Sequence, residues 1–263
     1  MRNYLAIVRK ELHTLFVSPI AYVVLAVFFV VTSFFFYVIL TNIMGRVFEQ
    51  GMAAQQFGGP PPAIDVPAIV MRNFFGVLNT ILLIVMPMIT MGVIAEERKR
   101  GTIELLLTSP ITNLQLILGK FTGLLIFLAI MLAPTIGTSI ILYFTSDPAP
   151  HLAPFLIGYL GAFLLGGTLI AIGVFISSLT ENQIVAAVIT FGASLLLWIF
   201  DALADPASSS AGSELVRYVS VLNHYEDFAK GVFDTQHLVF YLSFIFLGLF
   251  LTSLSLNSAK WRQ

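Results

Sequence analysis

The chain contains no cysteine, and only 10% of its 263 residues are charged. Without cysteine, neither a disulfide framework nor a thiolate metal site is available. A soluble domain carries about 25% charged residues, so this composition excludes an ordinary soluble protein. No basic patch is interleaved with aromatic residues, and nucleic acid is therefore not an expected partner. A hydrophobic fraction of 58% and a mean hydropathy of +0.94 indicate a protein that is solvated mainly by membrane lipid.

The sequence also lacks the motifs of nucleotide binding and of hydrolytic catalysis. Gly119-Lys120 is the only Gly-Lys pair, but Leu114 stands where a P-loop needs its first glycine, and Phe121 follows the lysine. The HExxH motif and a serine nucleophile elbow are absent as well. The four histidines are scattered along the chain, at His13, His151, His224 and His237. We therefore expect no catalytic residue, no bound cofactor and no metal site, and hence no enzyme.

Six apolar runs predict six membrane-spanning helices, because about 20 apolar residues cross the hydrocarbon core. They cover residues 20–41, 74–95, 121–144, 155–178, 184–201 and 238–256. In the fourth run, Gly158, Ala162 and Gly166 recur every four residues and form a small-residue stripe that lets helices approach closely. The predicted fold is a single all-α integral membrane domain over residues 1–263.

An amphipathic helix is predicted over residues 2–17, before the first span. Its two sides separate Arg2, Arg9, Lys10 and His13 from Tyr4, Leu5, Val8, Leu12, Leu15 and Phe16. This pattern is typical of a helix that lies in the plane of the membrane interface. Ser18 is then the expected N-cap of the first span, with Pro19 at its first helical position.

Two longer connections separate spans. Residues 42–73 are predicted to be a loop whose Gly- and Pro-rich centre, 55–62, has no regular structure. Residues 205–237 are predicted to hold two short helical pieces separated near Asn223-His224. Thr112 to Gln115 and Thr180 to Gln183 read as capping boxes at the starts of the third and fifth spans.

Few polar groups lie within the spans. Glu181 and Asp201 fall at span edges, where an ordinary interfacial position is the simpler reading. Asn79 and the threonines and serines of the spans are expected to hydrogen-bond between helices or to their own backbone. The phenylalanines at 34–36 and 74–75 allow either a wall for a lipid-like cargo or simple contact with lipid.

The distribution of charge predicts the orientation of the chain. With six spans, both termini and residues 96–120 and 178–184 lie on one side of the membrane. That side carries nine Lys and Arg residues against four on the other, whereas it carries five carboxylates against nine. Because loops rich in Lys and Arg stay in the cytoplasm, both termini and the 96–120 segment are predicted to be cytoplasmic.

The densest charge in the chain lies between the second and third spans, at residues 96–110. Such a segment cannot enter hydrocarbon. Gly101 interrupts the chain, Thr102 is a suitable N-cap, and Ser109-Pro110 ends the helix that follows. A short amphipathic helix over residues 102–108 is therefore predicted, with a shape suited to docking into another protein. An ordinary hydrophilic loop that only sets topology is the alternative.

Residues 97–110, Glu-Arg-Lys-Arg-Gly-Thr-Ile-Glu-Leu-Leu-Leu-Thr-Ser-Pro, resemble the signature of ABC-2 type permeases, the membrane subunits of one class of ATP-driven exporter. The likeness covers essentially the whole chain. Lys10-Glu11, residues 18–22, residues 179–183 and residues 231–235 resemble the gliding-motility-associated permease subgroup, and copper-enzyme maturation permeases have a similar pattern.

The resemblance implies a six-span subunit of the bacterial inner membrane that pairs with a second permease copy or paralogue and binds two cytoplasmic ABC ATPases. ATP and Mg²⁺ would be bound by those ATPases. The helix at residues 102–108 would be the coupling helix, residues 2–17 the connecting helix, and residues 205–237 short extracytoplasmic helices. The implied ATPase-coupling residues are Glu96, Glu97, Arg98, Gly101, Thr102, Ile103, Glu104, Leu106, Leu107, Ser109 and Pro110, and those of the connecting helix are Arg9, Lys10 and Glu11.

Two alternatives to export stay open at this point. One is a mechanotransmission or assembly subunit that uses the same ATPase to act on a periplasmic or envelope partner, which the connections at 42–73 and 205–237 would contact. The other is a channel or carrier that works without ATP. The cargo itself is not readable from the sequence.

Overall fold

A computed structural model describes residues 2–59, 64–102, 111–147, 150–203 and 220–260. All regular structure in these ranges is helical. The helices are α1 (Arg2–Val17), α2 (Pro19–Gln56), α3 (Val66–Thr90), α4 (Ala95–Lys99), α6 (Asn113–Thr145), α7 (Leu152–Leu179), α8 (Gln183–Leu203), α10 (Val221–Ala229) and α11 (Thr235–Lys260).

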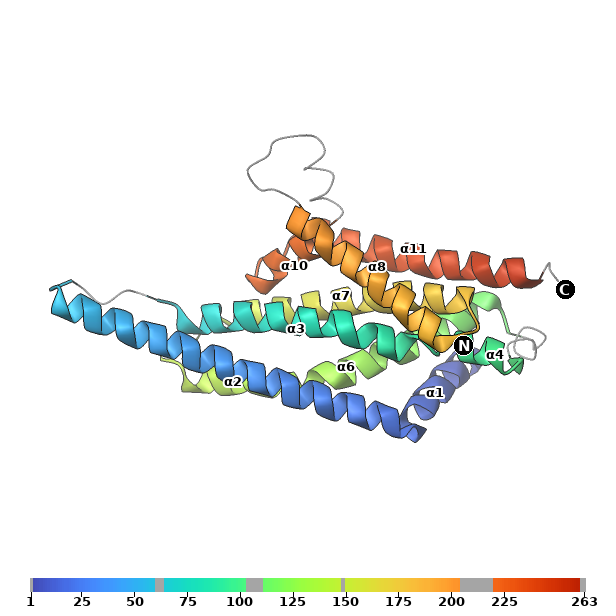
Figure 1. Ribbon diagram of the computed structural model, residues 1–263, viewed down its shortest axis with the longest axis horizontal. Coiled ribbons are helices and arrows are strands. Elements are labelled where there is room, and N and C mark those ends of the chain that lie inside the picture. The colour runs from blue at the N-terminus through green and yellow to red at the C-terminus, as the bar shows by residue number, and fades with distance from the viewer. Residues whose placement is uncertain (1, 60–63, 103–110, 148–149, 204–219, 261–263) are drawn as a thin grey trace.

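The long helices run back and forth along one bundle (Figure 1). α1, α4 and the end of α11 lie at one end of this bundle, which we name the α1 end. α10 and the connection between α2 and α3 lie toward the opposite end, which we name the α10 end. Each long helix therefore starts at the end where its predecessor finished, as in a chain that crosses a membrane repeatedly.

Five of the described helices are long and apolar enough to cross a membrane. They include α2, α6, α7 and α11, and the fifth is the segment Val66–Lys99 that contains α3 and α4. The apolar part of α8, Gln183–Ile199, is shorter than the length that this criterion requires. The chain is thus a multi-pass helical protein with five candidate crossings among the described residues, and α8 is too short to count as a sixth by this criterion.

The prediction of a loop over residues 42–73 is wrong for most of these residues. α2 continues to Gln56, and α3 already begins at Val66, where Asp65 caps it by accepting a hydrogen bond from the backbone N–H of Ala68. The predicted span stops at residue 41 because polar residues follow it. Residues such as Arg46 and Glu49 are nevertheless good helix formers and do not break a helix. The chain leaves α2 at Gly58, whose φ of +70° suits glycine.

The second predicted span, 74–95, is displaced toward the N-terminus. α3 covers residues 66–90, and a turn at residues 91–94 separates it from α4. The other predicted spans lie within helices that extend beyond them, and α6, for example, begins eight residues before position 121. Apolarity sets where a helix can lie in lipid, whereas caps and backbone hydrogen bonds set where the helix ends.

The predicted N-caps at Ser18 and Thr112 are confirmed. The Ser18 side chain accepts from the backbone N–H of Ile20, and Thr112 and Gln115 form the reciprocal capping box of α6. The predicted box at residues 180–183 is wrong in detail. There Asn182 is the capping residue, because its Oδ1 accepts from the backbone N–H groups of Ile184 and Val185.

α7 is the central helix of the bundle, with 78% of its apolar stretch buried. It packs against α3, α6, α8, α10 and α11. The predicted small-residue stripe permits these contacts, since Gly158 faces α3 and Gly166 faces Leu128 of α6. Ala162 between them is fully buried. The absence of side-chain bulk on α7 therefore sets how closely its neighbours approach.

The predicted break near Asn223-His224 is wrong, because both residues lie inside α10. The two histidines at this end are also not scattered. Nδ1 of His224 lies 2.6 Å from Nδ1 of His237 on α11, and His237 Nε2 lies 2.9 Å from Oδ2 of Asp227. The described residues contain no group of three or more His, Asp or Glu side chains placed to hold a metal ion. The pair therefore joins α10 to α11.

Candidate functional site

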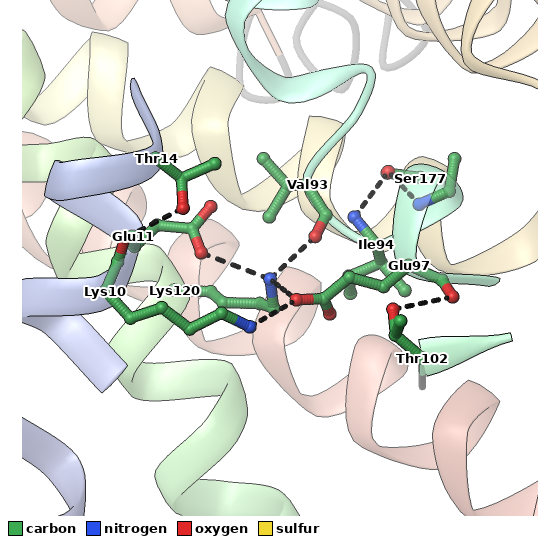
Figure 2. Close-up of polar contacts among 10 residues, drawn as sticks. Lys10, Glu11, Thr14, Val93, Ile94, Glu97, Thr102, Lys120 and Ser177 are labelled. Atoms are coloured by element: carbon green, nitrogen blue, oxygen red, sulfur yellow. Dashed lines mark hydrogen bonds and ion pairs between the residues drawn. The ribbon is translucent and has the colours of Figure 1, made fainter. Parts of the chain in front are cut away.

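A buried lysine at the α1 end joins three separate parts of the chain (Figure 2). Lys120, in the third turn of α6, has only 3% of its side chain exposed. Its Nζ lies 3.1 Å from Oε2 of Glu11 on α1 and 3.0 Å from Oε1 of Glu97 on α4. It also donates a 2.8 Å hydrogen bond to the carbonyl of Val93, in the turn between α3 and α4. One ammonium group thus fixes α1, α4 and this turn to α6.

The charges in this cluster balance. Lys10, on the exposed side of α1, reaches Oε1 of Glu97 at 3.1 Å, so that two lysines face Glu11 and Glu97. A buried charge without a partner is costly, and removing one member of a buried pair costs about 3–5 kcal/mol. We name Lys10, Glu11, Glu97 and Lys120 the junction cluster.

The close approach of α1 to α6 makes the junction cluster possible. A Cβ atom at Gly119 would lie 2.6 Å from Cγ2 of Ile7, and one at Gly123 would lie 2.9 Å from Cβ of Glu11. The hydroxyl of Tyr4 adds a 2.8 Å hydrogen bond to Thr122. Two glycines one helical turn apart therefore allow α1 to pack closely against α6, next to Lys120.

The buried face of α1 differs from the predicted one. Ile7, Val8 and Glu11 are buried, whereas Leu5, placed on the apolar side, is 62% exposed. Arg9 and Lys10 are exposed as expected. Glu11 turns toward the bundle because Lys120 supplies the charge that it needs there.

A serine on α7 holds the turn that precedes α4. Ser177 is fully buried, and its hydroxyl oxygen accepts from the backbone N–H groups of Ile94 and Ala95 at 3.1 and 3.0 Å. The same hydroxyl donates to the carbonyl of Met91 at 3.0 Å. The first N–H groups of a helix have no partner within the helix, so Ser177 does the work of an N-cap from another part of the chain.

The remaining described residues of the charged segment lie at the surface. Arg100 pairs with Glu96 one turn earlier, and Gly101 adopts a φ of +67°, which an L side chain rarely tolerates. The Thr102 hydroxyl donates to the carbonyl of Glu97 at 3.2 Å. The chain therefore turns sharply at Gly101, as predicted, and Thr102 holds it against α4.

The rest of the predicted coupling helix lies outside the described residues. This applies to Ile103, Glu104, Leu106, Leu107, Ser109 and Pro110. Of the predicted coupling and connecting residues that are described, the structure brings Lys10, Glu11 and Glu97 into contact. It leaves Arg9 outside that cluster.

Sequence reasoning missed Lys120 and Ser177. In the sequence, Lys120 stands out only as part of a Gly-Lys pair, and nothing singles out Ser177. A signal for Lys120 was present, since Glu11 falls on the same helical face as Tyr4, Val8 and Leu15. A carboxylate on an apolar face needs a cationic partner once it is buried.

A pocket of about 480 Å³ opens beside the junction cluster. Its lining includes the charged residues Lys10, Glu11, Glu97 and Lys120 and apolar residues such as Leu15 and Phe127. Glu97 Oε2 is buried here and has no hydrogen-bond partner among the described residues. The α1 end thus contains space and one acceptor that the described residues do not use.

These features define a multi-pass α-helical membrane protein whose charged segment between two spans is braced from the bundle by ion pairs and a serine. The chain matches the family described as "ABC-2 family transporter protein" over residues 5–255. It therefore belongs to the ABC-2 transporter family, and it is a membrane subunit of an ABC transporter.

Two curated relatives support this assignment. The "Probable multidrug ABC transporter permease YbhS" of Escherichia coli (strain K12) is 32% identical to this chain over 156 residues. The protein of the same name from Escherichia coli O157:H7 matches equally. Each match covers 51% of this chain but only 37% of the relative, so the chain spans well under half of the length of these relatives.

Proposed function

We propose that this chain is the permease subunit of an ABC exporter, driven by ATP that separate ATPase subunits bind and hydrolyse. The family assignment and the brace around the charged segment support this proposal. In it, α8 is the sixth span, because its place in the alternating order of Figure 1 matches a crossing. The distribution of Lys and Arg favours cytoplasmic termini in a bacterial inner membrane.

The junction cluster is the observation that carries the mechanism. A segment that receives a push from an ATPase moves the bundle only when rigid contacts connect the two. Here Glu97 connects α4 to α6 through Lys120, and Lys120 continues to Glu11 on α1. Ser177 connects the start of α4 to the central helix α7. A displacement of the segment after Gly101 would thus reach α1, α6 and α7 together.

The coupling residues keep the roles that the family resemblance implies. Residues 102–108 would dock on the ATPase, with Ile103, Leu106 and Leu107 as the apolar contacts and Glu104 beside them. Glu96, Arg98, Ser109 and Pro110 would border this contact. ATP and Mg²⁺ would belong to the partner, and a second permease copy or paralogue would complete the pathway. ATP drives the cycle only if it binds one arrangement of the complex better than the other.

The substrate class and the subgroup are further parts of the proposal. The relatives are named as probable multidrug permeases, which favours small organic molecules as cargo. The likeness at Lys10-Glu11 and at residues 18–22 favours the gliding-motility-associated subgroup. Export, rather than import, follows from the ABC-2 resemblance.

Copurification of this chain with an ABC ATPase of the same organism tests the proposal. Glu97→Gln and Glu104→Gln should weaken the ATPase complex and reduce its ATP turnover. Glu49→Gln, on α2 toward the α10 end, is the matched control and should change neither. Unchanged binding and turnover in Glu97→Gln and Glu104→Gln would overturn the coupling role.

One observation favours mechanotransmission as a second candidate function. α2 has 38 residues, which at about 1.5 Å per residue make a helix of about 57 Å, whereas the hydrocarbon core is about 30 Å thick. Its last turns extend past the start of α3 in Figure 1. Met44, Phe48 and Met52 recur there every four residues and are all more than half exposed. This face would be the contact with a periplasmic partner.

A crosslinking experiment separates the two functions. A photoreactive residue at position 48 should capture an envelope protein in cells if α2 transmits motion, and the same residue at position 29 serves as the control within the span. In that case Phe48→Ser should abolish the cellular function, while the ATPase still binds. Normal function in Phe48→Ser would contradict this candidate.

A further inference from the structure

A second pocket, of about 390 Å³, lies toward the α10 end of the bundle. It is formed by the first half of α3, by Trp198 of α8 and by one side of α10. Its lining includes Gly76, Asn79, Thr80, Trp198, Tyr225 and Glu226. Gly76 precedes Val93 by 17 residues along the chain, which corresponds to about 25 Å along a helix. The pocket is therefore well separated from the junction cluster.

Asn79 is the unusual residue of this pocket. It is only 2% exposed, and its Oδ1 is buried without a hydrogen-bond partner in the described part of the chain. By contrast, the neighbouring Thr80 and the buried Thr90 both donate to carbonyls of their own helix. Asn79 was expected to do the same or to bond another helix, but it does neither. A buried amide without partners destabilises a fold, which suggests that another molecule supplies them.

The chemistry of the lining indicates what that molecule is. Most of the lining residues are uncharged, and the Tyr225 hydroxyl is already committed as a donor to the carbonyl of Phe75. Arg72 and Glu226 line the pocket too, but they lie 4.0 Å from each other, and Lys230 also pairs with Glu226. Neither sign of charge is in excess. Trp198, at 42% exposure, offers an open aromatic face.

We propose that this pocket binds an uncharged aromatic compound that carries an amide or hydroxyl group. The polar group of the compound bonds the side-chain amide of Asn79, which can present either its oxygen or its nitrogen by rotation about Cβ–Cγ. The aromatic part stacks on Trp198. The inference rests on the proposed function in one respect, because it identifies the bound compound as cargo on its way through the permease.

Fluorescence of Trp198 provides the test, since the chain has only two tryptophans. Trp261→Phe leaves Trp198 as the sole reporter in the purified permease without any ATPase. The probe is chloramphenicol, an uncharged molecule with an amide, two hydroxyls and a nitrobenzene ring that quenches indole on contact. We expect saturable quenching, after correction for absorbed light. Asn79→Leu should raise the Kd about tenfold, as the loss of one hydrogen bond does.

Filling the pocket provides a second, independent variant. A Cβ atom at Gly76 meets nothing within 4 Å, so an added side chain has open space at its base, and Gly76→Leu should abolish saturable quenching by occupying the pocket. Gly137→Leu on α6 is the matched control, because Gly137 also faces open space but does not line the pocket. This control should quench like the parent protein. Asn79→Leu should keep or raise the unfolding temperature, since it removes an unsatisfied group.

Three results would overturn the proposal. The first is quenching that rises linearly and equally in the parent, Asn79→Leu and Gly76→Leu, which would be collision from the lipid phase. The second is nitrobenzene saturating as tightly as chloramphenicol, which would remove the polar recognition. The third is a tighter, Asn79-dependent response to cationic ethidium. All of these measurements use the permease alone, so a failure of ATPase binding leaves them unaffected, and the reverse also holds.

Discussion

The ring of Phe75 on α3 lies directly on Gly158 of α7. A Cβ atom at residue 158 would be 2.1 Å from Cε2 of that ring, closer than any real side-chain contact. Phe75 is fully buried, and its ring also meets Tyr159 edge-on, with 5.1 Å between the ring centroids. Because Phe75 is held from several sides, it cannot withdraw from an added methyl group. The contact fixes the spacing of α3 and α7, and it shows that this phenylalanine belongs to the core and not to a cargo wall.

Gly158→Ala should therefore destabilise the protein by about 1–3 kcal/mol, the usual cost of overpacking a core. Gly137→Ala, which has open space around its Cβ, should instead stabilise it by about 0.5–1 kcal/mol through helix propensity. Thermal unfolding of the two variants in detergent measures the difference. The double variant Gly158→Ala/Phe75→Leu should recover part of the loss. Equal unfolding temperatures for the two alanine variants would contradict this contact.

Ser177→Ala should loosen the start of α4. Two backbone N–H groups lose their acceptor in a buried place, which costs about 1–3 kcal/mol. Amide hydrogen exchange at Ile94 and Ala95 should rise in this variant. Ser178→Ala is the matched control, since the Ser178 hydroxyl donates to the carbonyl of Phe175 in its own helix. If exchange at residues 94–95 is unchanged in Ser177→Ala, the serine does not hold this turn.

Lys120→Met should cost about 3–5 kcal/mol, because it leaves Glu11 and Glu97 without their shared partner in a buried site. Lys230→Met removes a lysine whose ion pairs lie at the surface, and it should cost no more than about 1 kcal/mol. Unfolding in detergent measures both changes. Adding Glu11→Gln to Lys120→Met should restore part of the stability, since one buried charge is then gone. A loss as small as that of Lys230→Met would show that the junction cluster is not a structural brace.

The contact between α10 and α11 should depend on acid pH through Asp227. Partial burial alone would raise the pKa of this carboxyl, but the hydrogen bond from His237 and the nearby Lys230 lower the pKa below its ordinary value of 3.8. A lowered pKa means that the ionised group stabilises the fold above pH 3.8, and that this stabilisation is lost as the pH falls through the folded-state pKa. Asp227→Asn should therefore unfold at a lower temperature than the parent at pH 7.

The difference between the parent and Asp227→Asn should shrink below pH 3.8, because the parent carboxyl is then protonated as well. Unfolding temperatures measured from pH 7 down to pH 3 test this. Asp147→Asn, at an exposed aspartate, should match the parent throughout. A difference at pH 7 that persists unchanged at pH 3 would argue against an effect of charge.

Local signals in the sequence predicted the helices and several of their ends. Ser18-Pro19 and Thr112 with Gln115 act within four residues, and each forms the predicted cap. The length of α2 was underestimated because polarity was taken as the end of a helix, although residues 42–56 contain no proline and Gly45 and Gly51 each cost the helix only about 1 kcal/mol. The coupling helix over residues 102–108 stays a prediction.

The candidate site was predictable only in part. Glu97, Lys10 and Glu11 were selected through the family resemblance, but nothing local connects Glu11 with Lys120, 109 residues away. The same holds for Ser177, which lies 83 residues from Ile94. Such contacts depend on how helices pack, and α1 reaches Lys120 only because Gly119 and Gly123 let it approach α6.

Composition and periodicity alone determined that this protein is a helical membrane protein, because backbone hydrogen bonds in lipid must be satisfied within each segment. The pattern of residues 97–110 determined its family. The tertiary structure decided which of its few polar groups find a partner for an ion pair or a hydrogen bond. Lys120 and Glu11 neutralise each other because packing buries them together, whereas Oδ1 of Asn79 is buried without a partner among the described residues because α8 and α10 leave a pocket beside it. The free-energy cost of an unpaired charge or amide depends on how deeply the group is buried, and burial is a property of the folded chain.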